Sequence, residues 1–296
     1  MENLIDIESM NNDEIEKIIS LAKEYKFDNL RKNFSNKHAA LMFFENSTRT
    51  RFSFEYAINS LSAHPYIFDN SKSSSQKGEE AYDTINNLSA IGIDTFIIRT
   101  KDEFLIKDLK EKSYYNKVHF INAGSGKTSH PTQALLDYFT IKEIFGEIKG
   151  KKVAIIGDIR HSRVAKSNIA LLNKVGAKVV TSAPIYFKEE IEGAKYVQNL
   201  DEAIKDANVI MCLRVQNERL EAAINLEDFI KNYQINSDNL PQNAVLIHPG
   251  PVNRGIEVSN ELINSKRGQT ILEQAENGKY VRMAILDLIF SKGEEN

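Results

Sequence analysis

The sequence has almost no cysteine and no long apolar run. Its single cysteine among 296 residues, Cys212, lies inside the apolar run 209–213, where we expect a buried strand. One cysteine excludes a disulfide scaffold and is typical of a reducing compartment. No run approaches the roughly 18 apolar residues that a membrane-spanning helix needs. The first residues are acidic and lack the basic start and apolar core of a signal peptide. These absences predict a cytoplasmic protein.

Neither sign of charge is in excess. The chain has 38 Lys and Arg against 41 Asp and Glu, a net charge of −3, and a pI near 6.1. This balance argues against nucleic acid or a membrane surface as a partner. Local basic clusters are therefore expected to bind small anions. Hydrophobic residues at 42% are typical of an ordinary globular protein, and the length predicts two domains of about 150 residues each.

Motifs for nucleotides, metals and covalent catalysis are also missing. Gly126-Lys127-Thr128 suggests a P-loop, but that motif needs a glycine five residues earlier, where Ile121 stands. Gly157 follows an apolar strand without the partner glycines of a dinucleotide-binding turn. No Cys, His and Asp cluster has metal-ligand spacing, and neither a Gly-x-Ser-x-Gly turn nor paired carboxylates at turns occur. The sequence predicts no cofactor and no metal.

A phosphate-binding turn is predicted where the apolar strand 39–44 breaks at Asn46-Ser47 and a helical pattern follows. If Ser47 caps this helix, unpaired N–H groups and the helix dipole converge on the turn. Arg49 adds a planar guanidinium that matches phosphate geometry. The competing interpretation is a capped surface helix with solvated arginines. The apolar strand that leads directly into the turn favours the anion site.

Arginines recur at the ends of predicted strands, where parallel α/β sheets bind ligands. Arg99 ends a buried strand in the first half of the chain, and Arg163 and Arg214 follow strands in the second half. Arg49 with Arg99 could hold a phosphate, and Arg163 with Arg214 could hold a dicarboxylate. Such a site, rich in arginine and poor in nucleophiles, suits positioning of anions and stabilisation of developing negative charge. The residues alone predict transfer between a phosphorylated donor and an acidic acceptor.

Three further segments supply candidates. The segment 130–133 opens a helix, with Pro131 at the first helical position. A histidine in such a place is more often structural than catalytic, although His130 and Gln133 together offer neutral donors to a polar ligand. The proline-rich turn 248–255 leaves its carbonyls and the N–H of residue 250 available. The segment 69–80, rich in Ser and Lys, has the composition of a solvated connector.

Six stretches, distributed from about residue 40 to 290, together resemble the catalytic chains of aspartate carbamoyltransferases. They are FFENSTRTRFSFE, HPTQALLD, GDIRHSRVAKSN, LRVQNERL, HPGPVNRG and ENGKYVRMAIL. STRTR with HPTQ marks the carbamoyltransferase superfamily, and RVQNER with HPGPVNRG marks its aspartate branch. Ornithine enzymes would show a His-Cys-Leu-Pro turn and an acidic clamp, and both are missing here.

The resemblance implies an α/β fold with two domains, each a parallel sheet flanked by helices. Residues 1–145 would bind carbamoyl phosphate, with the C-terminal helix of about 271–292 packing back on them, and residues 146–270 would bind aspartate. The implied reaction gives N-carbamoyl-L-aspartate and phosphate in pyrimidine biosynthesis. Two alternatives remain: a carbamoyltransferase for ornithine or another amino acid, and a non-catalytic relative that keeps the fold.

The resemblance also assigns residue roles. Those implied for carbamoyl phosphate are Ser47, Thr48, Arg49, Thr50, Arg99, His130, Gln133, Gly250 and Pro251. Among them, the residues expected to act in catalysis are Arg49, Thr50, Arg99 and His130. Those implied for aspartate are Lys77, Arg163, Arg214 and Gln216.

The Ser-Lys segment 69–80 takes a different meaning from the resemblance. Its Ser73 and Lys77 would reach into a neighbouring subunit's site, so a homotrimer with shared active sites is expected. A regulatory chain and a dihydroorotase are alternative further partners of such a trimer. The chain departs from the usual family pattern at Ser125, Ser129 and Lys166, none of which is an implied ligand contact.

Overall fold

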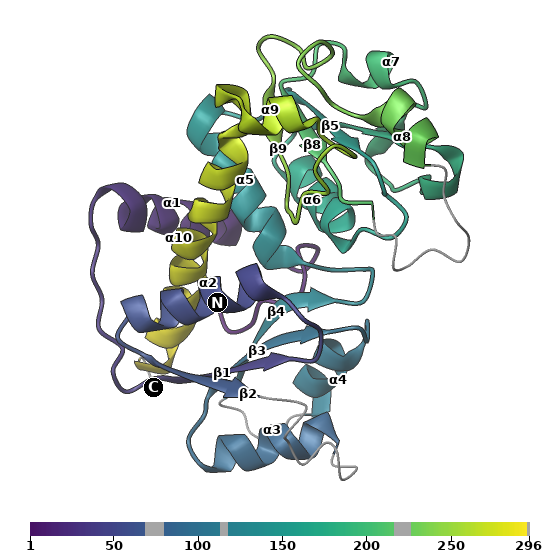
Figure 1. Cartoon of the computed structure of the whole chain (residues 1–296). Helices are drawn as coiled ribbons and strands as arrows, with labels where there is room; N and C mark the ends of the chain where they lie inside the picture. Colours follow the sequence, from purple (N-terminus) through teal and green to yellow (C-terminus); the bar gives the residue numbers. More distant parts are fainter. Residues whose placement is uncertain (69–79, 113–117, 216–225, 295–296) are drawn as a thin grey trace. The chain divides into compact units, whose positions relative to one another are not determined.

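The computed structural model describes residues 1–68, 80–112, 118–215 and 226–294 (Figure 1). The chain divides into two compact units, Met1–Leu135 with Gly278–Asn296, and Leu136–Asn277. Helices α5 (Pro131–Phe145) and α10 (Thr270–Phe290) therefore have residues in both units. The expected domain boundary at residues 145 and 146 stays a prediction about ligand-binding domains.

Within the described residues, the first unit has a four-stranded parallel sheet in the order β2-β1-β3-β4. The strands are β1 (His38–Phe43), β2 (His64–Phe68), β3 (Thr95–Thr100) and β4 (His119–Ser125). The accompanying helices are α1 (Asn12–Phe27), α2 (Thr48–Ser60), α3 (Ala81–Ala90) and α4 (Leu105–Lys112).

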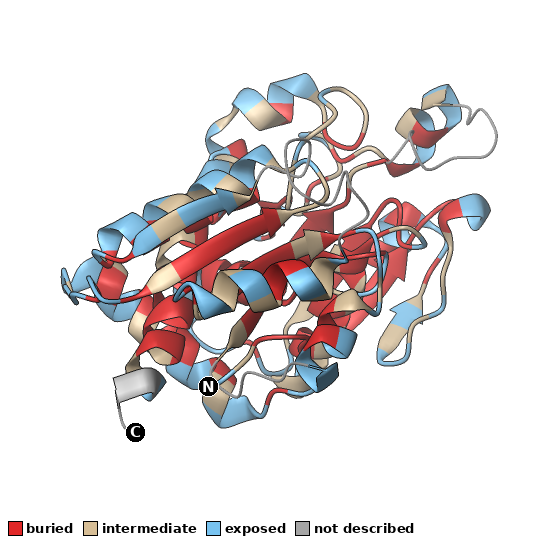
Figure 2. Ribbon diagram, turned by 90° about the horizontal axis from the view of Figure 1, so that it is seen from below, coloured by how far each residue is buried: buried red, intermediate tan, exposed pale blue. Residues whose placement is uncertain are grey.

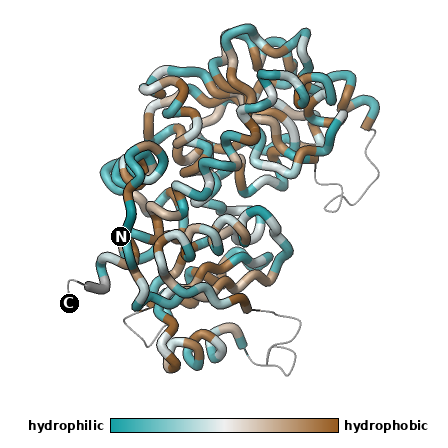
Figure 3. The backbone as a smooth tube through the Cα atoms, turned by 60° about the vertical axis from the view of Figure 1, so that its left-hand side comes forward, coloured by the Kyte–Doolittle hydropathy of each residue, from teal (hydrophilic) through white to brown (hydrophobic). Residues whose placement is uncertain are grey.

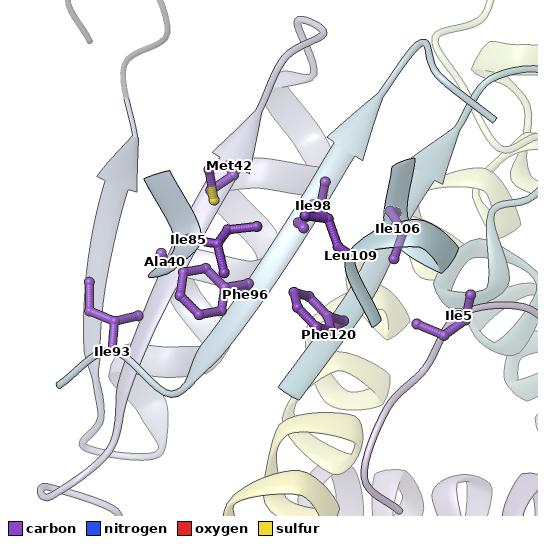
Figure 4. Packing of buried hydrophobic residues seen from close by; sticks show 10 residues of the cluster. All are labelled: Ile5, Ala40, Met42, Ile85, Ile93, Phe96, Ile98, Ile106, Leu109 and Phe120. Carbon is purple, nitrogen blue, oxygen red and sulfur yellow. The ribbon is translucent and has the colours of Figure 1, made fainter. Parts of the chain in front are cut away.

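Alternate residues of these strands point to opposite faces of the sheet, and both faces are covered. On one face, side chains of β1, β3 and β4 pack against α3 and α4 (Figure 4). This cluster consists of Ile5, Ala40, Met42, Ile85, Ile93, Phe96, Ile98, Ile106, Leu109 and Phe120. Because parallel strands covered on both faces are apolar at successive positions, runs such as 39–42 have no polar residue. This is why these strands can be recognised in the sequence.

Helices α1, α2 and the end of α10 are joined by buried and partly buried polar contacts in the first unit. The Arg282 Nη1 donates to Ser53 Oγ at 3.0 Å, which links α10 to α2. The side chain of Asp287 is 1% exposed and accepts from Tyr25 Oη at 2.8 Å and from Lys32 Nζ at 2.9 Å. These bonds fix the C-terminal part of α10 against the N-terminal part of the chain.

The second unit has, within the described residues, a five-stranded parallel sheet in the order β7-β6-β5-β8-β9. The strands are β5 (Lys152–Ile156), β6 (Lys178–Ser182), β7 (Ala194–Tyr196), β8 (Val209–Cys212) and β9 (Val245–Ile247). The helices are α6 (Arg163–Lys174), α7 (Leu200–Ile204), α8 (Leu226–Tyr233) and α9 (Asn260–Asn264), with 3₁₀ turns at Ile185–Phe187, Lys266–Gly268 and, in the first unit, Ser291–Glu294.

Burial and hydropathy follow the same division into sheets and covering helices. The central strands are buried along most of their length (Figure 2), and they coincide with hydrophobic stretches of the chain (Figure 3). Two parallel sheets, each flanked by helices, confirm the predicted fold class. No helix of the described part of the chain combines the length and apolar character needed to cross a bilayer.

Candidate active site

The predicted phosphate turn lies at the switch point of the first sheet. From β1 the chain passes to β2 on one side, and β3 then pairs with the other side of β1. In open parallel sheets, ligands bind outside the carboxyl ends of the strands where the strand order reverses. Ser47 to Thr50 follow the end of β1, and Arg99 lies near the end of β3, opposite Phe43. The sheet therefore brings the two predicted phosphate segments to one edge.

The first turn of α2 has the charge pattern of an anion-binding helix end. Ser47 is the N-cap by its backbone (φ −156°, ψ 102°), but its side chain makes no capping hydrogen bond. The turn has no acidic residue and includes Arg49 and Arg51. Cations at the positive end of a helix dipole are unfavourable by about 0.3–1 kcal/mol each. By contrast, α1 begins with a reciprocal capping box between Asn11 and Glu14. A bound anion at the start of α2 would offset the unfavourable interaction of these arginines with the helix dipole.

Arg99 and His130 lie beside each other. The Arg99 Nη1 donates to the backbone carbonyl of Ala123 at 3.2 Å and is 3.5 Å from His130 Nε2. The Arg99 Nε is 3.7 Å from a carboxylate oxygen of Glu45. On the other side of the imidazole, Thr132 Oγ1 is 3.4 Å from Nδ1. A guanidinium and an imidazole are thus placed together, where both can approach one anionic oxygen.

Glu45 and Thr132 are contacts that the sequence interpretation missed. Glu45 is in the same turn as Ser47, so its position was a usable signal, but its partner on β3 could not be read from spacing. Thr132 is fully buried, one residue after Pro131, which begins α5 as predicted. His130, Thr50 and Gln133 are also buried, at 4%, 7% and 8% exposure. These low values mean that a ligand there would meet groups already removed from most water.

The second unit has its own switch point, between β5 and β8. Gly157 follows β5 with φ +119°, and a Cβ at this position would be 2.8 Å from the Leu213 carbonyl. Glycine is required here by this close approach, which lets the ends of the two strands run side by side. Arg163 begins α6 after β5, and Arg214 follows β8 by two residues. The second arginine pair therefore also follows the two strands that flank a switch point.

Arg163 is fixed by the turn that precedes α6. Ser162 caps the helix, its Oγ accepting from Ala165 N at 3.1 Å. Earlier in the turn, His161 Nδ1 lies 2.9 Å from the buried carboxylate of Asp158. Arg163 is 7% exposed, whereas Arg160 in the same turn is exposed. A nearly buried guanidinium at a helix start is suited to a carboxylate ligand.

The turn after β9 presents the backbone predicted to bind an amide. Gly250 N donates to His248 Nδ1 at 2.8 Å, and His248 N donates to Gln274 Oε1 at 2.8 Å. The Gly250 N–H is therefore already used inside the turn, in contrast to the expectation that it is available. Pro251, which follows, is exposed.

The other candidate groups are three predicted site residues, any metal-binding cluster and the single cysteine. Ser73, Lys77 and Gln216 lie outside the described residues. Among the residues that are described, no group of three or more His, Cys, Asp or Glu side chains could hold a metal ion. Cys212 is buried, and this burial raises the pKa of its thiol, which makes it a poor nucleophile.

Comparison with known proteins gives the family. Residues 2–143 match the carbamoyl-P binding domain of aspartate/ornithine carbamoyltransferases, and residues 149–289 match their Asp/Orn binding domain. The catalytic subunit of aspartate carbamoyltransferase from Oceanobacillus iheyensis is 41% identical over an alignment of 297 residues, which covers 99% of this chain and 94% of that protein. The chain belongs to the aspartate carbamoyltransferase catalytic subunits.

Solved structures agree with this membership. The catalytic subunit of M. jannaschii aspartate transcarbamoylase superposes with a TM-score of 0.86 at 29% identity and covers 100% of both chains. An ornithine carbamoyltransferase from Pyrococcus furiosus also gives 0.86 at 29% identity, over 98% of this chain and 97% of that one. The backbone alone therefore does not separate the two branches of the superfamily. The full-length similarity to aspartate carbamoyltransferase assigns the chain as an enzyme with that activity.

Proposed function

We propose that this chain transfers the carbamoyl group of carbamoyl phosphate to the amino group of L-aspartate, giving N-carbamoyl-L-aspartate and phosphate, through the arginine pairs at its two switch points. One observation carries the proposal. In each unit, two arginines of the predicted set lie near or beyond the carboxyl ends of the strands that flank its own switch point. Two such pairs suit a reaction with one phosphorylated and one dicarboxylic substrate.

In the first unit, the start of α2 would bind the phosphate of carbamoyl phosphate. The backbone N–H groups and hydroxyls of Ser47, Thr48 and Thr50 would surround the phosphate, with the guanidinium of Arg49 beside them. The uncapped, acid-free first turn supports this role. Arg99 and His130, which lie 3.5 Å apart, would donate to the carbonyl oxygen.

The amide of the carbamoyl group would be bound by Gln133 and by backbone groups of Gly250 and Pro251. In the second unit, Arg163 and Arg214 would bind the two carboxylates of aspartate. Gln216 and Lys77, both outside the described residues, would add to this subsite. The low exposure of Arg163 favours a charge-assisted bond, because little water competes for the guanidinium.

The proposed chemistry needs positioning and electrostatics only. The neutral aspartate amine attacks the carbonyl carbon, a C–N bond forms, and the proton that the amine loses is taken up by the departing phosphate. The tetrahedral oxyanion is stabilised by Thr50, Arg99 and His130 until the C–O bond to phosphate breaks. Preorganised donors of this kind stabilise a transition state by several kcal/mol. No step as written uses a cofactor, a metal or a covalent enzyme intermediate.

Self-association into a homotrimer with shared active sites is the second part of the proposal. Large apolar side chains remain exposed on α2 and on the edge strand β2: Phe52 and Tyr56 are 55% exposed, and Tyr66 and Ile67 are 45% exposed. Exposed apolar surface of this kind is typical of an interaction site. The Ser-Lys segment with Ser73 and Lys77 would then serve a neighbouring subunit.

A mixing experiment tests the shared site. Trimers of Lys77→Ala and of Arg49→Ala, each inactive, are dissociated and reassembled together. In a mixed trimer, the intact Lys77 of one subunit can serve the site that holds the intact Arg49 of its neighbour. Part of the activity should therefore return. No recovery in mixed trimers of verified composition would count against a loop that serves the neighbouring site.

The proposal extends to the cellular setting. A chain with one buried cysteine and this activity is proposed to work in the cytoplasm, in the synthesis of pyrimidines.

The activity itself is tested by incubating the purified chain with carbamoyl phosphate and either aspartate or ornithine. Turnover of aspartate alone is expected, and preferential turnover of ornithine would overturn the proposal.

A further inference from the structure

Val215 stands between two residues proposed for aspartate, Arg214 and Gln216, just beyond the end of β8. It is fully buried, and its backbone N–H and C=O both need partners because no water reaches them. Both partners are side chains from one distant segment. Glu257 Oε1 accepts from Val215 N at 2.7 Å, and Asn253 Nδ2 donates to the Val215 carbonyl at 3.0 Å. The two side chains thus satisfy the backbone N–H and C=O of Val215, as the backbone of a neighbouring strand would.

The same two side chains also bind each other. Asn253 Nδ2 donates to Glu257 Oε1 at 2.7 Å, and Asn253 N donates to Glu257 Oε2 at 2.9 Å. Asn253 is two residues beyond Pro251, so these bonds hold the turn after β9 to the segment after β8. Glu257 is only 2% exposed, and its side chain is therefore confined.

The backbone that carries the Glu257 side chain is itself held by hydrogen bonds. The carbonyl of Glu257 accepts from Ile235 N at 2.9 Å, and Gln234 Nε2 donates to the Gly255 carbonyl at 2.7 Å. These bonds tie the segment 255–257 to the residues that follow α8. Movement of Glu257 would therefore require several hydrogen bonds to break together.

We infer that Glu257 and Asn253 are positioning residues, which form a clasp around Val215 and set the places of both substrate-binding segments of the second unit. The inference rests on the proposed function, because that proposal assigns Arg214 and the Gly250-Pro251 backbone to substrates. Neither residue belongs to the set proposed to bind a substrate. The clasp acts through the backbone that carries Arg214 and through the turn that carries Gly250.

The chemistry of the clasp requires a carboxylate at 257. Three hydrogen bonds to its two oxygens come from N–H donors of Val215 and Asn253, and His248 Nε2 lies 3.9 Å from Oε2. A glutamine has nearly the same shape, but its NH₂ group would face an N–H donor at whichever oxygen it replaced. Glu257→Gln should therefore break at least one of these bonds while leaving the packing volume almost unchanged.

The test compares Glu257→Gln with the matched control Glu261→Gln, which changes an exposed glutamate in the first turn of α9. Initial rates are measured against aspartate at saturating carbamoyl phosphate. The KM for aspartate should rise by about tenfold or more in Glu257→Gln, since small displacements of binding groups are costly. The KM of the control should stay at the wild-type value.

Asn253→Ala is the second variant, because it removes the other half of the clasp at a half-buried position. Its KM for aspartate should rise as well, and the double variant should show less than the product of the two single effects, since both belong to one unit. If Glu257→Gln does not fold, the KM for aspartate of Asn253→Ala tests the inference in its place.

Thermal unfolding separates positioning from simple structural support. A supporting contact alone would lower the unfolding temperature and the active fraction, hence kcat, while the KM for aspartate stayed unchanged. That result would overturn the inference. Failure of the proposed function is recognised separately, because the wild-type chain would then not carbamoylate aspartate at all.

Discussion

Replacing Arg163 by glutamine tests the aspartate subsite most sharply. Arg163 is the first residue of α6 and is 7% exposed, so its guanidinium is already largely desolvated. Glutamine keeps a long polar side chain and a good helix propensity, but it removes the charge. A hydrogen bond between charged partners contributes about 1.5–3 kcal/mol. Since 1.4 kcal/mol is tenfold, the KM for aspartate should rise roughly tenfold to a hundredfold.

Arg160→Gln is the matched control, because it removes the same charge three residues earlier from an exposed position. The main-chain bond from Arg160 N to the Phe187 carbonyl is untouched by this change. Product formation is measured against aspartate concentration at saturating carbamoyl phosphate, and carbamoyl phosphate affinity is measured by calorimetry. The reasoning is refuted if Arg163→Gln leaves the KM for aspartate unchanged, or if both variants change it equally.

Three further predictions concern the phosphate turn and buried acids. Arg49→Ala should lower kcat/KM for carbamoyl phosphate by about 3–5 kcal/mol of transition-state stabilisation, whereas Arg51→Ala should have a much smaller effect in the same rate assay. Asp287→Asn should lower the free energy of unfolding in urea by about 1.5–3 kcal/mol, because the buried carboxylate accepts from Tyr25 and Lys32; an unchanged midpoint would contradict this. Burial raises the pKa of Glu257 in the folded chain, although hydrogen bonds to its carboxylate oppose this. Its contribution to stability is therefore fully present below the unfolded pKa of about 4.3 and is lost as pH rises through the folded pKa. Urea unfolding at several pH values should show the wild type losing stability relative to Glu257→Gln across that window, and the opposite trend would contradict the burial argument.

The sequence predicts the fold well where strands are buried on both faces. The expected strand 39–44 is β1 (His38–Phe43), and the buried strand expected to end at Arg99 is β3 (Thr95–Thr100). The edge strand β7 (Ala194–Tyr196) was missed, because its three residues are partly or fully exposed and form no apolar run. Strand order depends on contacts between distant segments, so local patterns could not supply it.

The candidate site shows the same limit. Arg99 and Arg214 were visible in the sequence because each directly follows an apolar run. The grouping of the arginine pairs at two switch points required the observed sheet order. The contact of Glu45 with Arg99 and the hydrogen bonds from Glu257 and Asn253 to Val215 join segments that are far apart in the chain. No local spacing encodes such pairs.

The central claim is that this chain carbamoylates aspartate. The most direct measurement incubates the purified wild-type chain with carbamoyl phosphate labelled in its carbamoyl carbon, together with equal concentrations of aspartate and ornithine, and identifies the labelled product. Label is expected in N-carbamoyl-L-aspartate. Label in carbamoyl-ornithine, with none in carbamoyl-aspartate, would contradict the claim.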